Sequence, residues 1–155
     1  MHLYLIQHAE AKSEEEDPQR PLSNSGLTNI KKTAAFLQRG NVKIDKIYHS
    51  GKSRAVQTAQ VLEDVLTPPG GAVKADGLLP LDSPAIWVDR LVEMAGSVAI
   101  VGHLPHLSKL ASTLLCDAAE TGLITFKMAG VLCLRRNEQG LWLVQWMIVP
   151  ELCQG

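Results

Sequence analysis

The feature that most constrains the fold is a repeated pattern in which a short apolar run ends, a polar residue follows, and a helix-type pattern begins. The three clearest runs are residues 3–7, 46–49 and 97–101. Short apolar runs that alternate with helices are typical of buried parallel strands. Open α/β sheets bind ligands beyond the carboxyl ends of such strands. Because those ends meet at one edge, we expect His8, after the first run, and His103, after the third, to lie close together.

The rest of the chain fits the same alternation. Apolar residues at helical spacing predict four helices and one further short strand, namely helices from Ser23 to Gly40, around 55–66, around 86–92 and from Pro105 to about 114, and a strand near Val73. Residues 131–135 and 141–149 are typical of two strands joined by a hairpin at 137–140. We therefore expect an α/β three-layer sandwich, in which a mostly parallel sheet has helices on both faces and an antiparallel edge, within a single domain of residues 1–155.

Composition limits the classes of partner. The chain has 155 residues, 46% of them hydrophobic and 20% charged, as in ordinary globular proteins. Its formal net charge of -1 gives no general attraction to nucleic acid or anionic membranes, and no apolar run approaches the length of a membrane span. Three cysteines, an odd number without zinc-type spacing, indicate reduced thiols, and a strand pattern that begins at residue 3 leaves no room for a signal peptide. We expect a cytoplasmic protein whose partners are neither nucleic acid nor membrane.

Basic side chains stand at the same strand-to-helix corners. Arg54 lies in the opening turns of a predicted helix, where free N–H groups favour an anion, and Arg20 stands just before another helix. The planar fork of arginine suits bidentate binding of phosphate. Taken alone, each arginine would more simply form a surface ion pair, and His8 would more simply be structural. Together with His103 they indicate an anion-handling active site.

The segments that carry these residues resemble the three signature segments of the histidine phosphatase superfamily, which includes the phosphoglycerate mutases. They are residues 7–10 (Gln-His-Ala-Glu), 50–59 and 102–103. The chain is most similar to the small SixA-type phosphohistidine phosphatases, because it shares their compact size, the Arg-Pro-Leu-Ser-x-x-Gly stretch of residues 20–26 and a His-Leu-Pro run that begins at His103. The resemblance spans residues 3 to 149 and implies a phosphoglycerate mutase-like fold.

The resemblance also implies roles for single residues. His8 would be the nucleophile that takes the phosphoryl group. His103, the second catalytic histidine, and Arg54 would bind the transferring phosphate. Arg20 would add a further contact, and Ser50 belongs to the phosphate-binding segment. No metal or cofactor is required, because guanidinium and imidazolium groups supply the positive charge that a loose phosphoryl-transfer transition state needs. The expected substrate is a phosphohistidine domain of a partner protein or a small phosphorylated molecule.

The first departure from the family pattern lies beside the nucleophile. Gln7 stands where the superfamily normally has arginine, and Ala9 where it has glycine. Gln7 remains a candidate phosphate ligand through its amide, but it brings no charge. Losing one charge-assisted contact to the transition state costs about 2–4 kcal/mol, roughly 30- to 1,000-fold in rate. Arg20 and Lys52 are alternative sources of that charge, so we expect weakened but real phosphatase activity.

The second departure concerns the general acid. Many superfamily members carry a glutamate before the third helix, where this chain has residues 78–82, and Asp82 is the nearest carboxylate. A turn or helix-capping role is the simpler interpretation of Asp82. A P–N bond breaks readily once its nitrogen is protonated, so weak acid assistance suits phosphohistidine better than a sugar phosphate. The chain also has no long segment for a lid, which predicts an open site that admits a histidine of a folded partner.

Two other functions compete with this one. A metallohydrolase would gather His8, His49, His103 and His106, and the last two are compatible with one helical face. The H-E-x-x-H spacing is absent and the arginines would repel a cation, so we interpret His106 as a helix-surface residue and His49 as a rim residue that does not react. The other alternative is a phosphate- or phosphoprotein-binding module of the same fold with little or no turnover, and Gln7 is its main support.

Overall fold

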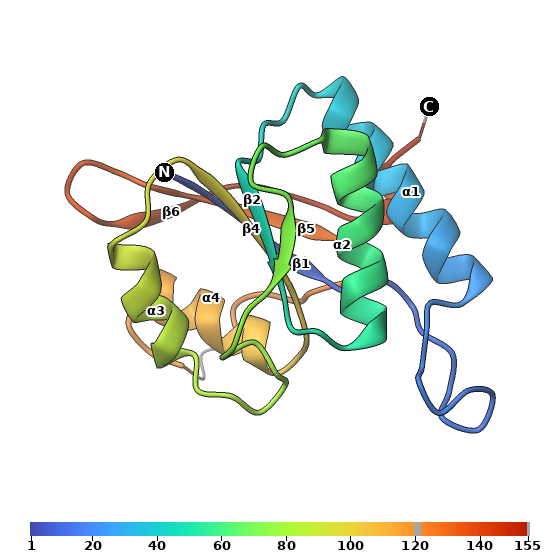
Figure 1. The fold of residues 1–155 in the computed structure, drawn as a ribbon. Helices are drawn as coiled ribbons and strands as arrows, with labels where there is room; N and C mark the ends of the chain where they lie inside the picture. The colour runs from blue at the N-terminus through green and yellow to red at the C-terminus, as the bar shows by residue number, and fades with distance from the viewer. Residues whose placement is uncertain (120–121, 155) are drawn as a thin grey trace.

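The structure, a computed structural model, describes residues 1–119 and 122–154 and is drawn in Figure 1. Its strands and helices alternate along the chain in the predicted order. The strands are β1 His2–Gln7, β2 Lys46–His49, β3 Ala72–Lys74, β4 Ser97–Gly102, β5 Val131–Arg136 and β6 Trp142–Ile148. The helices are α1 Asn24–Arg39, α2 Ser53–Leu66, α3 Ala85–Val92, α4 His106–Cys116 and the short 3-10 helix η1 Pro150–Leu152.

The strands form one six-stranded sheet in the order β3-β2-β4-β1-β5-β6. The pairs β1–β4, β2–β4 and β2–β3 are parallel, whereas β5 runs antiparallel to β1, and β6 antiparallel to β5. The predicted mostly parallel sheet with an antiparallel edge is therefore confirmed. Residues 97–101, read from the sequence as a buried central strand, lie in β4 between β1 and β2.

Helices cover both faces of this sheet, as the three-layer prediction requires (Figure 1). The core on one face joins Tyr4 and Ile6 of β1 to residues of α1 and α2, and the core on the other joins Leu3 and Leu5 to residues of α3 and α4. This alternation along β1 follows from the two-residue repeat of a strand. Both faces of β1 are buried, which explains why its sequence is an almost continuous apolar run.

The N-terminus of α1 is fixed to the loop that follows β1. The Ser23 hydroxyl accepts a hydrogen bond from the Gly26 N–H at 3.0 Å, as predicted for an N-cap, and the Ser23 N–H donates to the Glu10 carbonyl at 2.9 Å. A Cβ at position 26 would collide with that carbonyl oxygen, so only glycine allows this approach. The loop of residues 10–22 is thus held close to its own starting point.

Two side chains of α2 hold the site segments in place. Thr58 is fully buried, and its hydroxyl accepts from the Ala9 N–H at 3.0 Å and donates to the Arg54 carbonyl at 2.7 Å. The side-chain Oε1 of Gln57 accepts from the Leu22 N–H at 2.6 Å. The chain on either side of the 10–22 loop is therefore tied to the helix that carries Arg54.

Within the described ranges, none of the helices combines the length and the apolar character that crossing a bilayer demands.

We expect Thr58→Val to lower the free energy of unfolding by about 1–3 kcal/mol, because it leaves the buried Ala9 N–H without an acceptor. Thr113→Val is the matched control. Its hydroxyl also donates to the carbonyl four residues earlier, but it accepts no hydrogen bond from another segment of the described chain. Urea unfolding of the two variants measures the difference. Equal losses would mean that the bond between α2 and Ala9 adds nothing.

Candidate active site

The two histidines at the carboxyl ends of β1 and β4 meet at one edge of the sheet. The ring centroids of His8 and His103 lie 5.0 Å apart, with their planes inclined by 51°. The His8 N–H donates to the carbonyl of Gly102 at 3.0 Å, which extends the parallel pairing of β1 and β4 by one residue. The proximity expected from the strand pattern is present.

His8 is held in one tautomer by its neighbour. Its Nδ1 lies 2.8 Å from the carbonyl oxygen of Ala9, and a carbonyl can only accept a hydrogen bond, so Nδ1 carries the proton. The lone pair is then on Nε2. Burial lowers the pKa of His8, the bond to Ala9 opposes this, and the charges of Arg54 and Arg20 lower the pKa further. The imidazole is therefore a neutral base at pH 7.

His103 is hydrogen-bonded to Ser50. Its Nε2 lies 2.6 Å from the Ser50 hydroxyl, and that hydroxyl accepts from the Lys52 N–H at 3.3 Å. When the serine donates its own proton to Nε2, Nδ1 of His103 carries the ring proton. In the part of the chain that the structure describes, this buried Nδ1 has no hydrogen-bond partner. A donor remains for a group that enters the site.

Burial and charge keep His103 neutral. Burial, followed by the nearby His8, Arg54, Lys52 and His106, lowers the pKa of His103 to about 3. A single anion placed between these groups would face cations and N–H donors instead of competing positive charges. The electrostatics therefore favour an anionic ligand.

Two arginines, Arg20 and Arg54, lie beside the two histidines. Arg54 is in the first turn of α2, and Arg20 is delivered by the 10–22 loop in a left-handed backbone conformation (φ 48°), with its Nε donating to the Lys12 carbonyl at 3.1 Å. Both line a cleft of about 290 Å³, together with Lys52 and Glu14. Burial and the charge of Arg20 lower the pKa of Arg54, and Glu14 partly offsets them. The cleft is suited to an anion between the two guanidinium groups.

Gln7 lies next to His8 in the chain and adds no charge to the site. It is the last residue of β1, and its carbonyl accepts from the Ala129 N–H at 2.9 Å. Its side-chain oxygen is buried and finds no hydrogen-bond partner among residues 1–119 and 122–154. This unpartnered atom is an acceptor and brings no positive charge, so the charge expected at this position in the superfamily is missing.

Asp82 closes a turn. Its carboxylate accepts from the Leu79 N–H at 2.9 Å, in agreement with the turn role that the sequence favours. It lines a cavity of about 320 Å³ together with Ser50, on the side of the site toward α3. Asp82 thus lies near Ser50, and one of its carboxylate oxygens is bound to the turn.

His49 and His106 do not complete a metal site with His8 and His103. His49 accepts from the Gly51 N–H at 3.2 Å through Nδ1. His106 is fully buried, so its interpretation as a helix-surface residue is wrong. It shares the apolar stripe of α4 with Leu107 and Leu110, a signal that its spacing already contained. The described ranges hold no group of three or more His, Cys, Asp or Glu side chains placed to bind a metal ion.

The sequence predicts the proximity of His8 and His103, but not the residues that position the segments around them. Gln57 and Thr58 belong to the same segment as Arg54, yet their hydrogen bonds reach residues more than thirty positions away. A polar residue beside a catalytic motif gives no sign of which backbone group it will bind.

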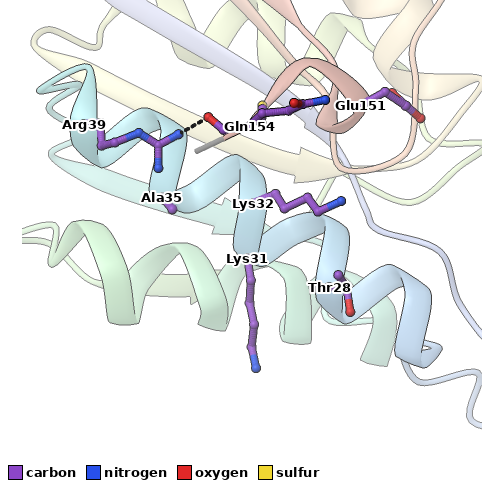
Figure 2. A pocket seen from close by; sticks show the side chains of 8 residues that line it. Thr28, Lys31, Lys32, Ala35, Arg39, Glu151 and Gln154 are labelled. Carbon is purple, nitrogen blue, oxygen red and sulfur yellow. Dashed lines mark hydrogen bonds between the residues drawn. The ribbon is translucent and has the colours of Figure 1, made fainter.

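A larger cavity, of about 560 Å³, lies elsewhere, between α1 and the C-terminal segment. Figure 2 shows Arg39 bound to the Gln154 carbonyl, at 2.9 Å, and Lys31 pointing away from that segment. The cavity lining includes neither histidine of the cluster, so it is not the candidate active site.

Comparison with known proteins places the chain in a family. Residues 3–75 match the model of the histidine phosphatase superfamily, branch 1. The chain is 32% identical over 143 residues to an uncharacterized protein of Picosynechococcus sp. (strain ATCC 27264 / PCC 7002 / PR-6). This alignment covers 87% of this chain and 85% of that protein. It is 24% identical over 155 residues to phosphohistidine phosphatase SixA of Escherichia coli (strain K12), with 97% of this chain and 94% of that protein covered.

Solved structures share the whole fold. The protein histidine phosphatase SixA complexed with tungstate matches with a TM-score of 0.87 at 23% identity, over 99% of this chain and 100% of that chain. A putative alpha-ribazole-5'-P phosphatase from Escherichia coli str. K-12 substr. MG1655 matches with a TM-score of 0.79 at 16% identity, over 97% and 98% of the two chains. With its phosphoglycerate mutase-like fold and these matches, the chain belongs to the histidine phosphatase superfamily and is similar to its SixA-type members.

Proposed function

We propose that the protein is a phosphatase that removes phosphate from phosphohistidine on proteins, through a phosphoenzyme intermediate at His8. The observation that supports this most directly is the state of His8: a neutral imidazole whose Nδ1–H is fixed by the Ala9 carbonyl and whose Nε2 is left with a lone pair. The relative solved with tungstate, a tetrahedral oxyanion, and the relative named phosphohistidine phosphatase support the same assignment.

The reaction proceeds in two displacements. Nε2 of His8 forms a bond to phosphorus as the bond from phosphorus to the substrate imidazole breaks, and that imidazole leaves neutral when its other nitrogen carries a proton. Water then attacks the phosphorus, the bond to His8 breaks, and inorganic phosphate leaves. The water proton that is released passes to phosphate or to solvent, and His8 returns to its neutral form with Nδ1 still bound to Ala9.

Positive charge and N–H donors stabilise the transferring group. Arg54 and Arg20 face the peripheral oxygens, Ser50 fixes the tautomer of His103, and the Nδ1–H of His103 donates to the same oxygens. Because these groups supply the charge, we propose that turnover needs no added metal ion. Gln7 supplies an amide contact only and makes the enzyme slow.

The leaving group favours phosphohistidine over a phosphomonoester. Asp82 is the nearest candidate for a general acid, and its carboxylate is used by the Leu79 N–H. An alkoxide leaving group needs a proton donor, whereas a protonated imidazole nitrogen leaves without one. We assign Asp82 at most a minor role as general acid.

We further propose that residues 1–155 act as one domain in the cytoplasm. Strands from the two halves of the chain, β1 and β6, lie in one sheet, and Cys116, Cys133 and Cys153 are free thiols. A phosphoprotein-binding module without turnover is the alternative, and the neutral Gln7 is the observation that favours it.

We expect a phosphorylated substrate to leave an acid-labile, base-stable phosphate on the wild-type protein and none on His8→Asn, because Nε2 of His8 is the nucleophile. Rapid quench with ³²P-labelled phosphohistidine protein measures this. His49→Asn is the matched control: it also removes a histidine at a strand end, but His49 lies outside the cluster. Label that persists in His8→Asn would contradict the proposal, and phosphate binding without label or turnover would favour the module.

His8 and His103 should both be neutral at pH 7 with the proton on Nδ1. ¹⁵N NMR of the two imidazoles measures this directly. Their folded pKa values lie below the ordinary value, and that of His103 is about 3. Below pH 6.5 the unfolded chain takes up a proton on His103 that the folded chain does not. The free energy of unfolding therefore decreases as the pH is lowered, by up to about 1.4 kcal/mol per pH unit for this residue, until its folded pKa is reached. A His103 signal that titrates near pH 6.5 would contradict the assignment.

Gln7→Arg should raise kcat for phosphohistidine at least about tenfold, because one charge-assisted contact to the transition state is worth roughly 30- to 1,000-fold. Gln145→Arg adds the same charge on exposed β6, remote from the cluster, and should leave the rate unchanged. No gain from Gln7→Arg, together with an inactive His8→Asn, would show that another group already provides the charge.

A further inference from the structure

Three apolar side chains are exposed beside the candidate site. Leu79 is 42% exposed, Leu81 87% and Ile86 40%. We call these three residues the apolar rim. Single exposed leucines are common on protein surfaces and need no explanation, but a group of them beside a reactive centre is typical of a binding surface.

The apolar rim is continuous with the catalytic cluster. Leu79 and Ile86 line the same cavity of about 320 Å³ as Ser50, and the Ser50 hydroxyl is hydrogen-bonded to His103. A molecule whose phosphorus lies at His8 therefore has this apolar surface beside it, on the side toward α3.

The turn that carries Leu81 is built to hold it out. The Asp82 N–H donates to the Leu79 carbonyl at 3.1 Å, and the Asp82 carboxylate accepts from the Leu79 N–H at 2.9 Å. Pro80 occupies the second position of this turn, where its fixed φ is favourable. A leucine on a rigid exposed turn adds nothing to the core, yet it loses little conformational freedom when it is covered.

The opposite wall of the site is charged. The loop of residues 10–22 carries exposed carboxylates at Glu14, Glu15 and Glu16, and Glu14 lines the cleft of Arg20 and Arg54. Figure 1 shows this loop and the turn before α3 protruding at the same end of the molecule, on either side of the α2 N-terminus. A ligand that contacts both walls must be far larger than a phosphorylated metabolite.

We propose that the apolar rim is the docking surface for a folded protein substrate, which presents its phosphohistidine next to an apolar patch and has basic residues on the side that faces Glu14–Glu16. This rests on the proposed phosphohistidine phosphatase function. Leu81 is the central contact, and Leu79 and Ile86 extend it toward the reactive histidines.

The test compares two substrates of one chemistry. They are a histidine phosphotransfer domain phosphorylated with phosphoramidate, and free phosphohistidine. Leu81→Ser should raise KM for the domain about tenfold or more, because covering a leucine side chain removes a large apolar area from water, and should change kcat/KM for the free amino acid less than twofold. The conservative variant Leu81→Met should have a KM for the domain close to that of wild type. Leu152→Ser is the matched control, since Leu152 is 67% exposed in η1, away from the site, and should match wild type on both substrates.

The outcomes separate the docking surface from the chemistry. Wild-type protein that hydrolyses neither substrate would overturn the proposed function, and the docking surface with it. Wild-type activity on both, with Leu81→Ser equal to Leu152→Ser on the domain, would overturn only the docking surface. An equal loss on both substrates in Leu81→Ser would show that Leu81 acts on the reactive site and would also overturn it.

Discussion

The parallel pairing of β1 with β4 is the constraint on which the rest of the site depends. In this register Gln7 lies opposite Gly102, so His8 and His103 are the next residues on two adjacent strands. A shift of one residue would turn one imidazole to the other face of the sheet, because side chains alternate along a strand. The buried faces of β1 and β4 prevent such a shift, since it would bring the apolar set of each face into the wrong core. Core packing therefore fixes the distance between the two histidines.

The site that results is unfavourable until an anion enters it. Backbone and hydroxyl hydrogen bonds hold together two neutral imidazoles, His103 buried and His8 half-buried. Beside them lie an arginine with a buried Nε that has no partner in the described chain, and a second arginine in a left-handed conformation. Thr58 and the Ser23 cap supply much of that support from outside the reactive groups. The surrounding structure thus maintains an arrangement of cations and N–H donors that suits an anion, which is the usual form of electrostatic preorganisation.

The sequence predicts the frame of this protein better than its details, for physical reasons. Periodicity reports burial, so it located the strands, the helices and the antiparallel edge, and it placed His8 and His103 at one edge of the sheet. The surface position predicted for His106 is wrong, because its place on the apolar stripe of α4 outweighs its polarity. The partners of Thr58 were beyond prediction, because a hydrogen bond across 49 residues depends on how whole elements pack.

Asp82 links the chemistry of the site to its shape. A carboxylate at this position is suited either to protonating a leaving group or to closing the turn of residues 79–82, and its bond to the Leu79 N–H commits it to the turn. In the proposed reaction, weak acid assistance suits a leaving group that carries its own proton, which an imidazole does and a sugar hydroxyl does not. The same turn holds Leu81 outward, where it enlarges the exposed surface beside Asp82. Under the proposed function, one side chain therefore favours a nitrogen leaving group and supports a wider surface, and both effects suit the phosphohistidine of a folded protein.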